Sequence, residues 1–211
     1  MFVNSILKPS HECITFKKED SLKLVLETLL EKDIQSAPVL ENTKFIGMVS
    51  KQMIYEKYFE TETITKEDFL QNNKVEDIVD HGDLFITKKD VFEKTLTAFK
   101  GFPLLAVVDE DANFLGIVTR FEVLEQFESA FGMKKSGVRI AFTSTEAEGR
   151  ISRLTDILNS FHSNIIAIAT FDETDKLLRR IVIKIEKNDN VDRIIKKLEK
   201  SGFRILDVKE M

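Results

Sequence analysis

The feature that most constrains this chain is an internal repeat, in which two stretches share one order of apolar and polar residues. The stretch "APVLENTKFIGMVSKQMI" (37–54) parallels "AVVDEDANFLGIVTRFEVL" (106–124). Each reads as an apolar strand, a polar turn, and a second strand that ends in glycine, an apolar residue, valine and Ser or Thr before a helix begins. Gly47 is matched by Gly116 and Ser50 by Thr119, both pairs being 69 residues apart. The repeat therefore predicts one folding unit present twice.

The segments upstream of the two stretches repeat as well. "CITFKKEDSLKLVLETLLEK" (13–32) matches "LFITKKDVFEKTLTAFKG" (84–101), each a short strand, a lysine pair, an acidic residue and an amphipathic helix. One unit is thus strand–helix–strand–strand–helix, about 55–60 residues long. A lead-in, "KVEDIVDHG" (74–82), echoes "VNSILKPSH" (3–11).

The last third of the chain has a different order of elements. We expect a strand over 136–144, a helix within 145–164, a hairpin over 165–186 that turns at 172–176, then a helix closed by Gly202 and a final strand. This βαββαβ order is the ferredoxin-like plan, an α+β fold in which both helices cover one face of an antiparallel sheet.

The expected domain limits follow from these patterns. The first unit takes residues 1–60 and the second takes 81–133, separated by an acidic, partly helical linker at 61–80. The last domain takes residues 137–211, after the small and basic segment 132–137.

Composition narrows the classes of function. The net charge of −5 argues against broad binding to nucleic acid, and Cys13, the one cysteine, excludes an internal disulfide. The start of the chain lacks a signal-peptide pattern and no apolar run reaches the roughly 20 residues that span a bilayer, so we expect a cytoplasmic protein without a membrane partner. Neither a metal-ligand cluster nor a nucleophile–base set stands at a recognisable spacing, which predicts no metal site and no enzyme activity.

The repeated motifs resemble a pair of cystathionine-β-synthase (CBS) domains. The tail, with "EGRISRL" and "HSNIIAI", resembles an ACT domain, and the combination resembles regulatory proteins of the acetoin-utilisation type. The repeat sequences are also similar to those of Gram-positive CBS-pair proteins that bind cyclic di-AMP. The resemblance implies two βαββα units packed sheet to sheet, a homodimer, and an adenine nucleotide held in a cleft between the units. It implies a sensor without a cofactor that acts on a protein partner, such as a metabolic or nucleotide-signalling enzyme.

The stretch "GIVTRFEVL" (116–124) carries the candidate anion site. Thr119 followed by Glu122 is a capping box, which satisfies free backbone N–H groups at a helix start without any ligand. Arg120 adds a planar guanidinium at a helix N-terminus, where anions are already favoured. In related nucleotide-binding domains the capping Ser or Thr and the acid three residues later contact ribose or phosphate, and here that acid is Glu122 rather than the usual Asp.

The resemblance takes the other wall of the cleft from the first unit. Its residues are Ile14 and Thr15 on the opening strand and Ser36, Ala37 and Pro38 before the next strand. Small side chains at 36 and 37 let a flat purine approach the backbone. The alternative for Ala37 and Pro38 is a strand entry that binds nothing.

The first copy lacks the acid of the second. Ser50 is followed by Lys51, Gln52 and Met53, and a methionine side chain cannot accept a hydrogen bond from a ribose hydroxyl as a carboxylate does. We therefore expect two unequal clefts, with the ligand in the one that uses Thr119 and Arg120.

A second interpretation makes the C-terminal domain the sensor. Gly149 and Asn164 match positions near the effector site of amino-acid-binding ACT domains, with the CBS pair as a scaffold. The alternative is that Gly149 shapes the loop and Asn164 turns the chain.

Overall fold

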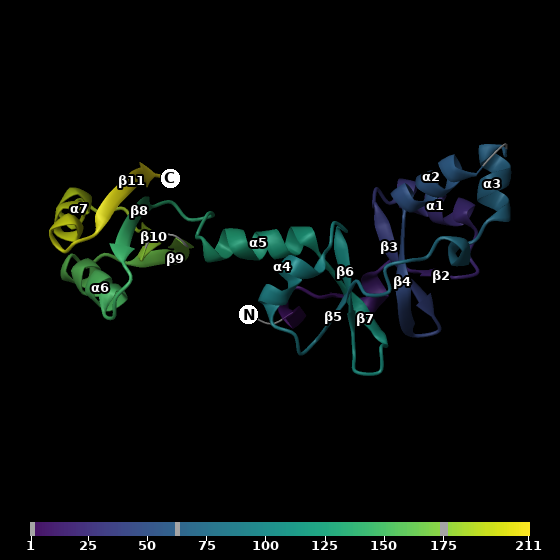
Figure 1. The fold of residues 1–211 in the computed structure, drawn as a ribbon, viewed down its shortest axis with the longest axis horizontal. Helices are drawn as coiled ribbons and strands as arrows, with labels where there is room; N and C mark the ends of the chain where they lie inside the picture. The colour runs from purple at the N-terminus through teal and green to yellow at the C-terminus, as the bar shows by residue number, and fades with distance from the viewer. Residues whose placement is uncertain (1–2, 62–63, 174–176) are drawn as a thin grey trace. The chain divides into compact units, whose positions relative to one another are not determined.

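The structure is a computed structural model that describes residues 3–61, 64–173 and 177–211. The chain divides into two compact units, Met1–Leu124 and Glu125–Met211, which are described separately (Figure 1). The expected hairpin turn at 172–176 lies largely outside the described residues.

The first repeat forms a three-stranded sheet with helices. Its elements are β2 (Phe16–Lys17), α1 (Leu22–Glu31), β3 (Ser36–Glu41), β4 (Lys44–Ser50) and α2 (Lys51–Glu60). The strand order is β2-β3-β4, parallel between β2 and β3 and antiparallel between β3 and β4. Helix α1 starts where the Ser21 hydroxyl accepts a hydrogen bond from the Leu24 N–H, and it buries Leu22, Val25, Leu26 and Leu29.

The second repeat has the same order, which confirms the predicted duplication. Its elements are β5 (Phe85–Thr87), the 3₁₀ turn η4 (Phe92–Lys94), α4 (Thr95–Ala98), β6 (Leu104–Val108), β7 (Phe114–Thr119) and α5 (Arg120–Ala130). The expected amphipathic helix is reduced to one 3₁₀ turn and a four-residue helix, because Val91 provides no side-chain cap and two threonines disfavour propagation.

Each lead-in crosses to the other repeat. The segment before the first repeat consists of η1 (Val3–Ser5), β1 (Lys8–Pro9) and η2 (Ser10–Glu12), and β1 pairs with β7 of the second repeat. The segment before the second repeat contains η3 (Val75–Asp77), and Asp80 bridges Met48 in β4 of the first repeat. The two repeats are therefore joined by a reciprocal exchange, which gives the echo between residues 3–11 and 74–82 its physical meaning.

The two repeated glycines make this exchange possible. A Cβ at Gly116 would lie 2.0 Å from the Lys8 carbonyl oxygen, and Gly116 has φ of +150°. A Cβ at Gly47 would lie 2.6 Å from the Asp80 carbonyl oxygen. Any side chain at either position would push the incoming lead-in away from its strand.

The hairpin tips of the two repeats also meet. The Phe114 N–H donates to the Thr43 carbonyl at 2.8 Å, and the Phe45 N–H donates to the Ala112 carbonyl at 3.2 Å. The Asp109 carboxylate accepts hydrogen bonds from the Asn113 side chain and backbone, and these bonds hold the pKa of Asp109 below its ordinary value.

The linker between the repeats contains α3 (Lys66–Asn72), followed by η3. The expectation of a partly helical linker is thereby confirmed. Helix α3 is fixed by Phe69, which is buried and has its ring centroid 5.3 Å from that of Tyr58 on α2.

The C-terminal unit confirms the ferredoxin-like plan. Its elements are β8 (Val138–Thr145), α6 (Arg150–Ser160), β9 (Ile165–Glu173), β10 (Leu178–Ile185), α7 (Val191–Lys200) and β11 (Arg204–Glu210). The sheet has the order β11-β8-β10-β9 with every neighbouring pair antiparallel. Gly202, with φ of +81°, follows α7 as the sequence predicts.

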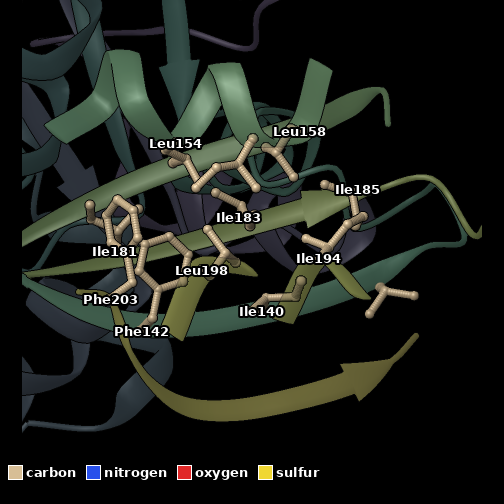
Figure 2. Close-up of a cluster of buried hydrophobic side chains, with 12 residues drawn as sticks. Ile140, Phe142, Leu154, Leu158, Ile181, Ile183, Ile185, Ile194, Leu198 and Phe203 are labelled. Atoms are coloured by element: carbon tan, nitrogen blue, oxygen red, sulfur yellow. The ribbon is translucent and has the colours of Figure 1, made fainter. Parts of the chain in front are cut away.

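One apolar core holds this unit together. Figure 2 shows side chains of α6 and α7 meeting those of β8 and β10, among them Leu154, Leu198, Ile140 and Ile183. Phe142 and Phe203 pack edge to face with their centroids 5.2 Å apart. Both helices therefore cover the same face of the sheet.

The segment 132–137 is held by the C-terminal unit. The buried Lys184 ammonium donates to the Gly132 carbonyl at 3.0 Å, and Gly137 and Met211 exchange two backbone hydrogen bonds. The expected domain limits at 60, 80, 133 and 137 stay predictions.

We predict that Gly116→Ala lowers the free energy of unfolding of the N-terminal unit by on the order of 3 kcal/mol, through positive φ and a clash with the Lys8 carbonyl. Gly101→Ala is the matched control, because Gly101 also has positive φ but no atom within 4 Å of a built Cβ, and we expect it to cost about 1 kcal/mol.

Urea unfolding followed by tyrosine fluorescence measures the N-terminal unit selectively, because Tyr55 and Tyr58 are the two tyrosines and the chain has no tryptophan. Equal losses in the two variants would contradict a role for the close approach of Lys8.

Candidate functional site

A cleft of about 420 Å³ lies in the N-terminal unit at the start of α5. The lead-in, the first repeat and the second repeat all contribute to it, since it is lined by Lys8, Pro38 and Arg120 among others. Its walls are mostly apolar, formed by Ile14, Ile34, Pro38, Pro103, Leu104 and Ile117. Its dimensions and lining are those of a small-molecule site.

The start of α5 contains the predicted capping box. The Glu122 N–H donates to the Thr119 hydroxyl at 3.3 Å, and the Thr119 N–H donates to Glu122 Oε2 at 2.9 Å. The Thr119 hydroxyl is also hydrogen-bonded to that carboxylate. This arrangement stabilises the helix start by about 1 kcal/mol without a ligand, so a ribose contact through Glu122 stays a prediction.

Arg120 lies at the rim of the cleft. Its backbone N–H donates to the Pro103 carbonyl at 2.9 Å, and its Nη2 donates to the Phe102 carbonyl at 2.8 Å. The guanidinium carbon lies 5.5 Å from the ring centroid of Phe99. Among the described residues no carboxylate lies within ion-pair distance of Arg120, although Glu12 and Glu122 line the same cleft.

Only some of the residues expected on the opposite wall line the cleft. Ile14, Ser36 and Pro38 line the cleft. Ala37 points into the core, with 1% of its surface exposed, and Thr15 does not contribute to the lining. Ile14 and Thr15 also precede β2 rather than lie on it, because the strand starts at Phe16.

Ser36 has an unusual environment. The residue is 2% exposed, and its hydroxyl oxygen has no hydrogen-bond partner. A buried hydroxyl left without a partner costs about 1–3 kcal/mol, so such a group invites a ligand or water. Ser36 lines this cleft and also the second one.

Several residues that line the cleft were not predicted from the sequence. Lys8 and Glu12 come from the lead-in and Cys13 directly follows it, and the exchange of the lead-in onto β7 has no local signal in the sequence. Phe121 also lines the cleft and keeps 69% of its surface exposed. An aromatic residue directly after Arg120 was the available signal for it.

A second cleft of about 320 Å³ occupies the corresponding place beside α2. The Ser50 hydroxyl accepts a hydrogen bond from the Met53 N–H at 3.1 Å, and Gln52 donates to Glu56 at 2.7 Å. The lining includes Glu56 but neither Lys nor Arg. The two clefts therefore differ chemically, because the second has no basic Lys or Arg side chain with which an anion could pair.

In the C-terminal unit Gly149 and Asn164 have structural partners. Gly149 takes positive φ of 76° as the N-cap of α6, and the Asn164 amide donates to Glu186 at 2.9 Å. Arg150 stacks on Phe203 at 4.1 Å and donates to the carbonyls of Ser201 and Gly202. These contacts explain both residues without an effector, and a role of Gly149 and Asn164 in binding stays a prediction.

The described part of the chain shows neither a metal-binding cluster nor a membrane-spanning helix. It contains no group of three or more His, Cys, Asp or Glu residues placed to hold a metal ion. Within residues 3–61, 64–173 and 177–211, no helix has both the length and the hydropathy that a membrane span requires.

The comparisons with known proteins agree with this geometry. The family model of the CBS domain matches residues 3–60. An uncharacterised protein of Methanocaldococcus jannaschii is 27% identical over 189 residues, which span 83% of this chain and 67% of that protein.

Two solved structures share the fold. A CBS domain-containing protein of unknown function from Bacillus anthracis is 26% identical, with 61% of this chain and 93% of that chain covered and a TM-score of 0.55. Listeria monocytogenes CbpB in complex with c-di-AMP is 27% identical, with coverage of 60% and 94% and a TM-score of 0.53. Residues 3–60 thus match the CBS domain model, the second repeat has the same order of elements, and a domain with the ferredoxin-like strand order follows them.

We predict that Cys13 reacts slowly with iodoacetamide near neutral pH. Burial raises the pKa of the Cys13 thiol, an effect that the nearby Lys8 charge only partly offsets, so the reactive thiolate is scarce in the folded protein. The alkylation rate should keep rising beyond pH 9, the ordinary value for a thiol being 9.0.

Mass spectrometry of the alkylated chain measures the alkylation rate of Cys13 directly, since the chain has one cysteine. The urea-unfolded protein is the control and should react like a free thiol. A rate in the folded protein that levels off below pH 8 would contradict the effect of burial.

Proposed function

We propose that this chain is a non-catalytic regulatory protein that senses an adenine nucleotide, cyclic di-AMP in the first place and AMP or ATP otherwise. The ligand binds in the cleft at the start of α5. Binding changes the affinity of the chain for a protein partner. The C-terminal unit serves as an ACT domain, and the chain acts in the cytoplasm as a homodimer.

The observation that carries this proposal is the guanidinium of Arg120 beside the first turn of α5. The cleft is lined by Thr119, Arg120 and Glu122 together. The N-terminus of a helix favours anions through its N–H groups and dipole, and an arginine with free donors adds a charge-assisted grip on phosphate. Arg120 is already oriented by its bond to the Phe102 carbonyl, which lowers the entropy that binding would cost.

The rest of the cleft suits a purine. Its apolar walls at Ile14, Pro38 and Ile117 offer flat surfaces, and the Ser36 hydroxyl is a donor and acceptor without a partner. A base there would be held by apolar contact and read by a small number of polar groups.

The comparisons support the ligand class. The Listeria monocytogenes structure is a complex with c-di-AMP, and it is 27% identical to this chain with 60% of this chain covered. A cyclic dinucleotide has two phosphates, and Arg120 in the lining of the cleft would bind one of them.

A sensor of this kind works by differential binding. A nucleotide that binds one arrangement of the CBS pair more tightly than another shifts the population toward it. The partner must then distinguish the same two arrangements, and by reciprocity the partner must change the affinity for nucleotide.

The alternative is an amino-acid sensor in the C-terminal unit. Gly149 and Asn164 would contact the effector, and the CBS pair would be a scaffold. A thermal-shift screen separates the two functions, because stabilisation by amino acids alone would support the alternative.

We predict that Arg120→Ala weakens the binding of cyclic di-AMP by at least about tenfold, since a hydrogen bond to a charged group contributes roughly 1.5–3 kcal/mol. Isothermal titration calorimetry with purified full-length protein measures the change. Arg120→Lys should be intermediate, because it keeps the charge and loses the fork.

Lys51→Ala is the matched control, since Lys51 follows Ser50 as Arg120 follows Thr119, and its N–H donates to Gln35 as that of Arg120 donates to Pro103. We expect it to bind like the wild type. Equal losses in Arg120→Ala and Lys51→Ala, or unchanged affinity in Arg120→Ala, would refute the assigned cleft.

A further inference from the structure

We infer that Phe121 is a stacking platform for a second nucleobase and makes this cleft selective for dinucleotides over mononucleotides. The inference rests on the proposed function and adds a specificity-determining residue to it. Neither the sequence motif nor the capping box assigns a role to Phe121.

The first argument is exposure. Phe121 lies in the first turn of α5 and lines the cleft, yet 69% of its surface is exposed. A phenylalanine ring in contact with water gives up the burial that would stabilise the fold. A flat aromatic face at the rim of a cleft is what a base can cover, and stacking of this kind tolerates any base because each has a π-face.

The second argument is the combination of groups that line one cleft. The apolar walls and the unpartnered Ser36 hydroxyl provide a place for one base. Arg120 provides the contact to phosphate, and its guanidinium lies over Phe99. Phe121, the next residue, also lines the cleft. A ligand that fills all three places has a base, a phosphate and a second base.

The third argument is the contrast with the other repeat. Gln52 occupies the position that corresponds to Phe121, 69 residues earlier. Its amide is bonded to Glu56, and that cleft contains neither Lys nor Arg. The aromatic face and the guanidinium therefore occur in the same cleft, as expected if both serve one ligand.

The test compares cyclic di-AMP with AMP by titration calorimetry on the full-length wild type, Phe121→Ala, Phe121→Tyr and Gln52→Ala. Phe121→Ala should lose about tenfold in affinity for cyclic di-AMP and less than about twofold for AMP. Phe121→Tyr should retain wild-type selectivity because it keeps the ring. Gln52→Ala should bind both nucleotides like the wild type.

Three results would overturn the inference. Unchanged selectivity in Phe121→Ala would exclude the platform, while leaving nucleotide sensing intact if the wild type binds. A change in molar mass by light scattering in Phe121→Ala without ligand, with the nucleotide selectivity retained, would mean that the ring is covered by a second copy of the chain. If the wild type binds neither nucleotide, the proposed function fails and the inference fails with it.

Discussion

The N-terminal unit depends on the close approach of each lead-in backbone to a glycine of the other repeat. The Lys8 and Asp80 carbonyls occupy the space in which Gly116 and Gly47 would have side chains. Each repeat is a small sheet with helices, which cannot bury enough apolar surface alone. The reciprocal exchange makes one unit from two, and the meeting of the hairpin tips at Thr43 and Asn113 reinforces it.

The same exchange builds the cleft. It delivers Lys8 of the lead-in, and Cys13 directly after the lead-in, to the start of α5, where the second repeat contributes Thr119 and Arg120. Duplication would make two equivalent clefts, but the side chains have diverged on a common backbone. Arg120 and Phe121 stand in the first turn of α5. The equivalent positions in the first turn of α2 are a lysine and a glutamine, Lys51 and Gln52. Of these two clefts, one is lined by Lys8 and Arg120 and the other by neither Lys nor Arg.

The C-terminal unit has an independent physical basis. Its core is contributed by two helices and the strands of one sheet, and Arg150 is saturated by Phe203, Ser201 and Gly202. In the N-terminal cleft the Ser36 hydroxyl is buried without a hydrogen-bond partner and the Arg120 guanidinium donates to the Phe102 carbonyl. The C-terminal unit also holds one buried polar atom without a partner, Arg179 Nε on β10. The two units are thus alike in this respect, and what sets the N-terminal unit apart is a cleft that brings an arginine and an unpartnered hydroxyl together.

The sequence by itself determined the duplication, the ferredoxin-like order of the last third, the helix start at Thr119 and the contrast between Glu122 and Met53. These features are periodic or local, so neighbouring residues carry them. It could not place Thr15 and Ala37, which were assigned to the cleft by analogy and do not line it. Only the tertiary structure decided that the lead-ins exchange, that Cys13 lines the cleft and that Phe121 stays exposed at its rim. The pairing of Lys8 with Ile117 joins residues more than a hundred positions apart in the chain, and no local propensity specifies such a pairing.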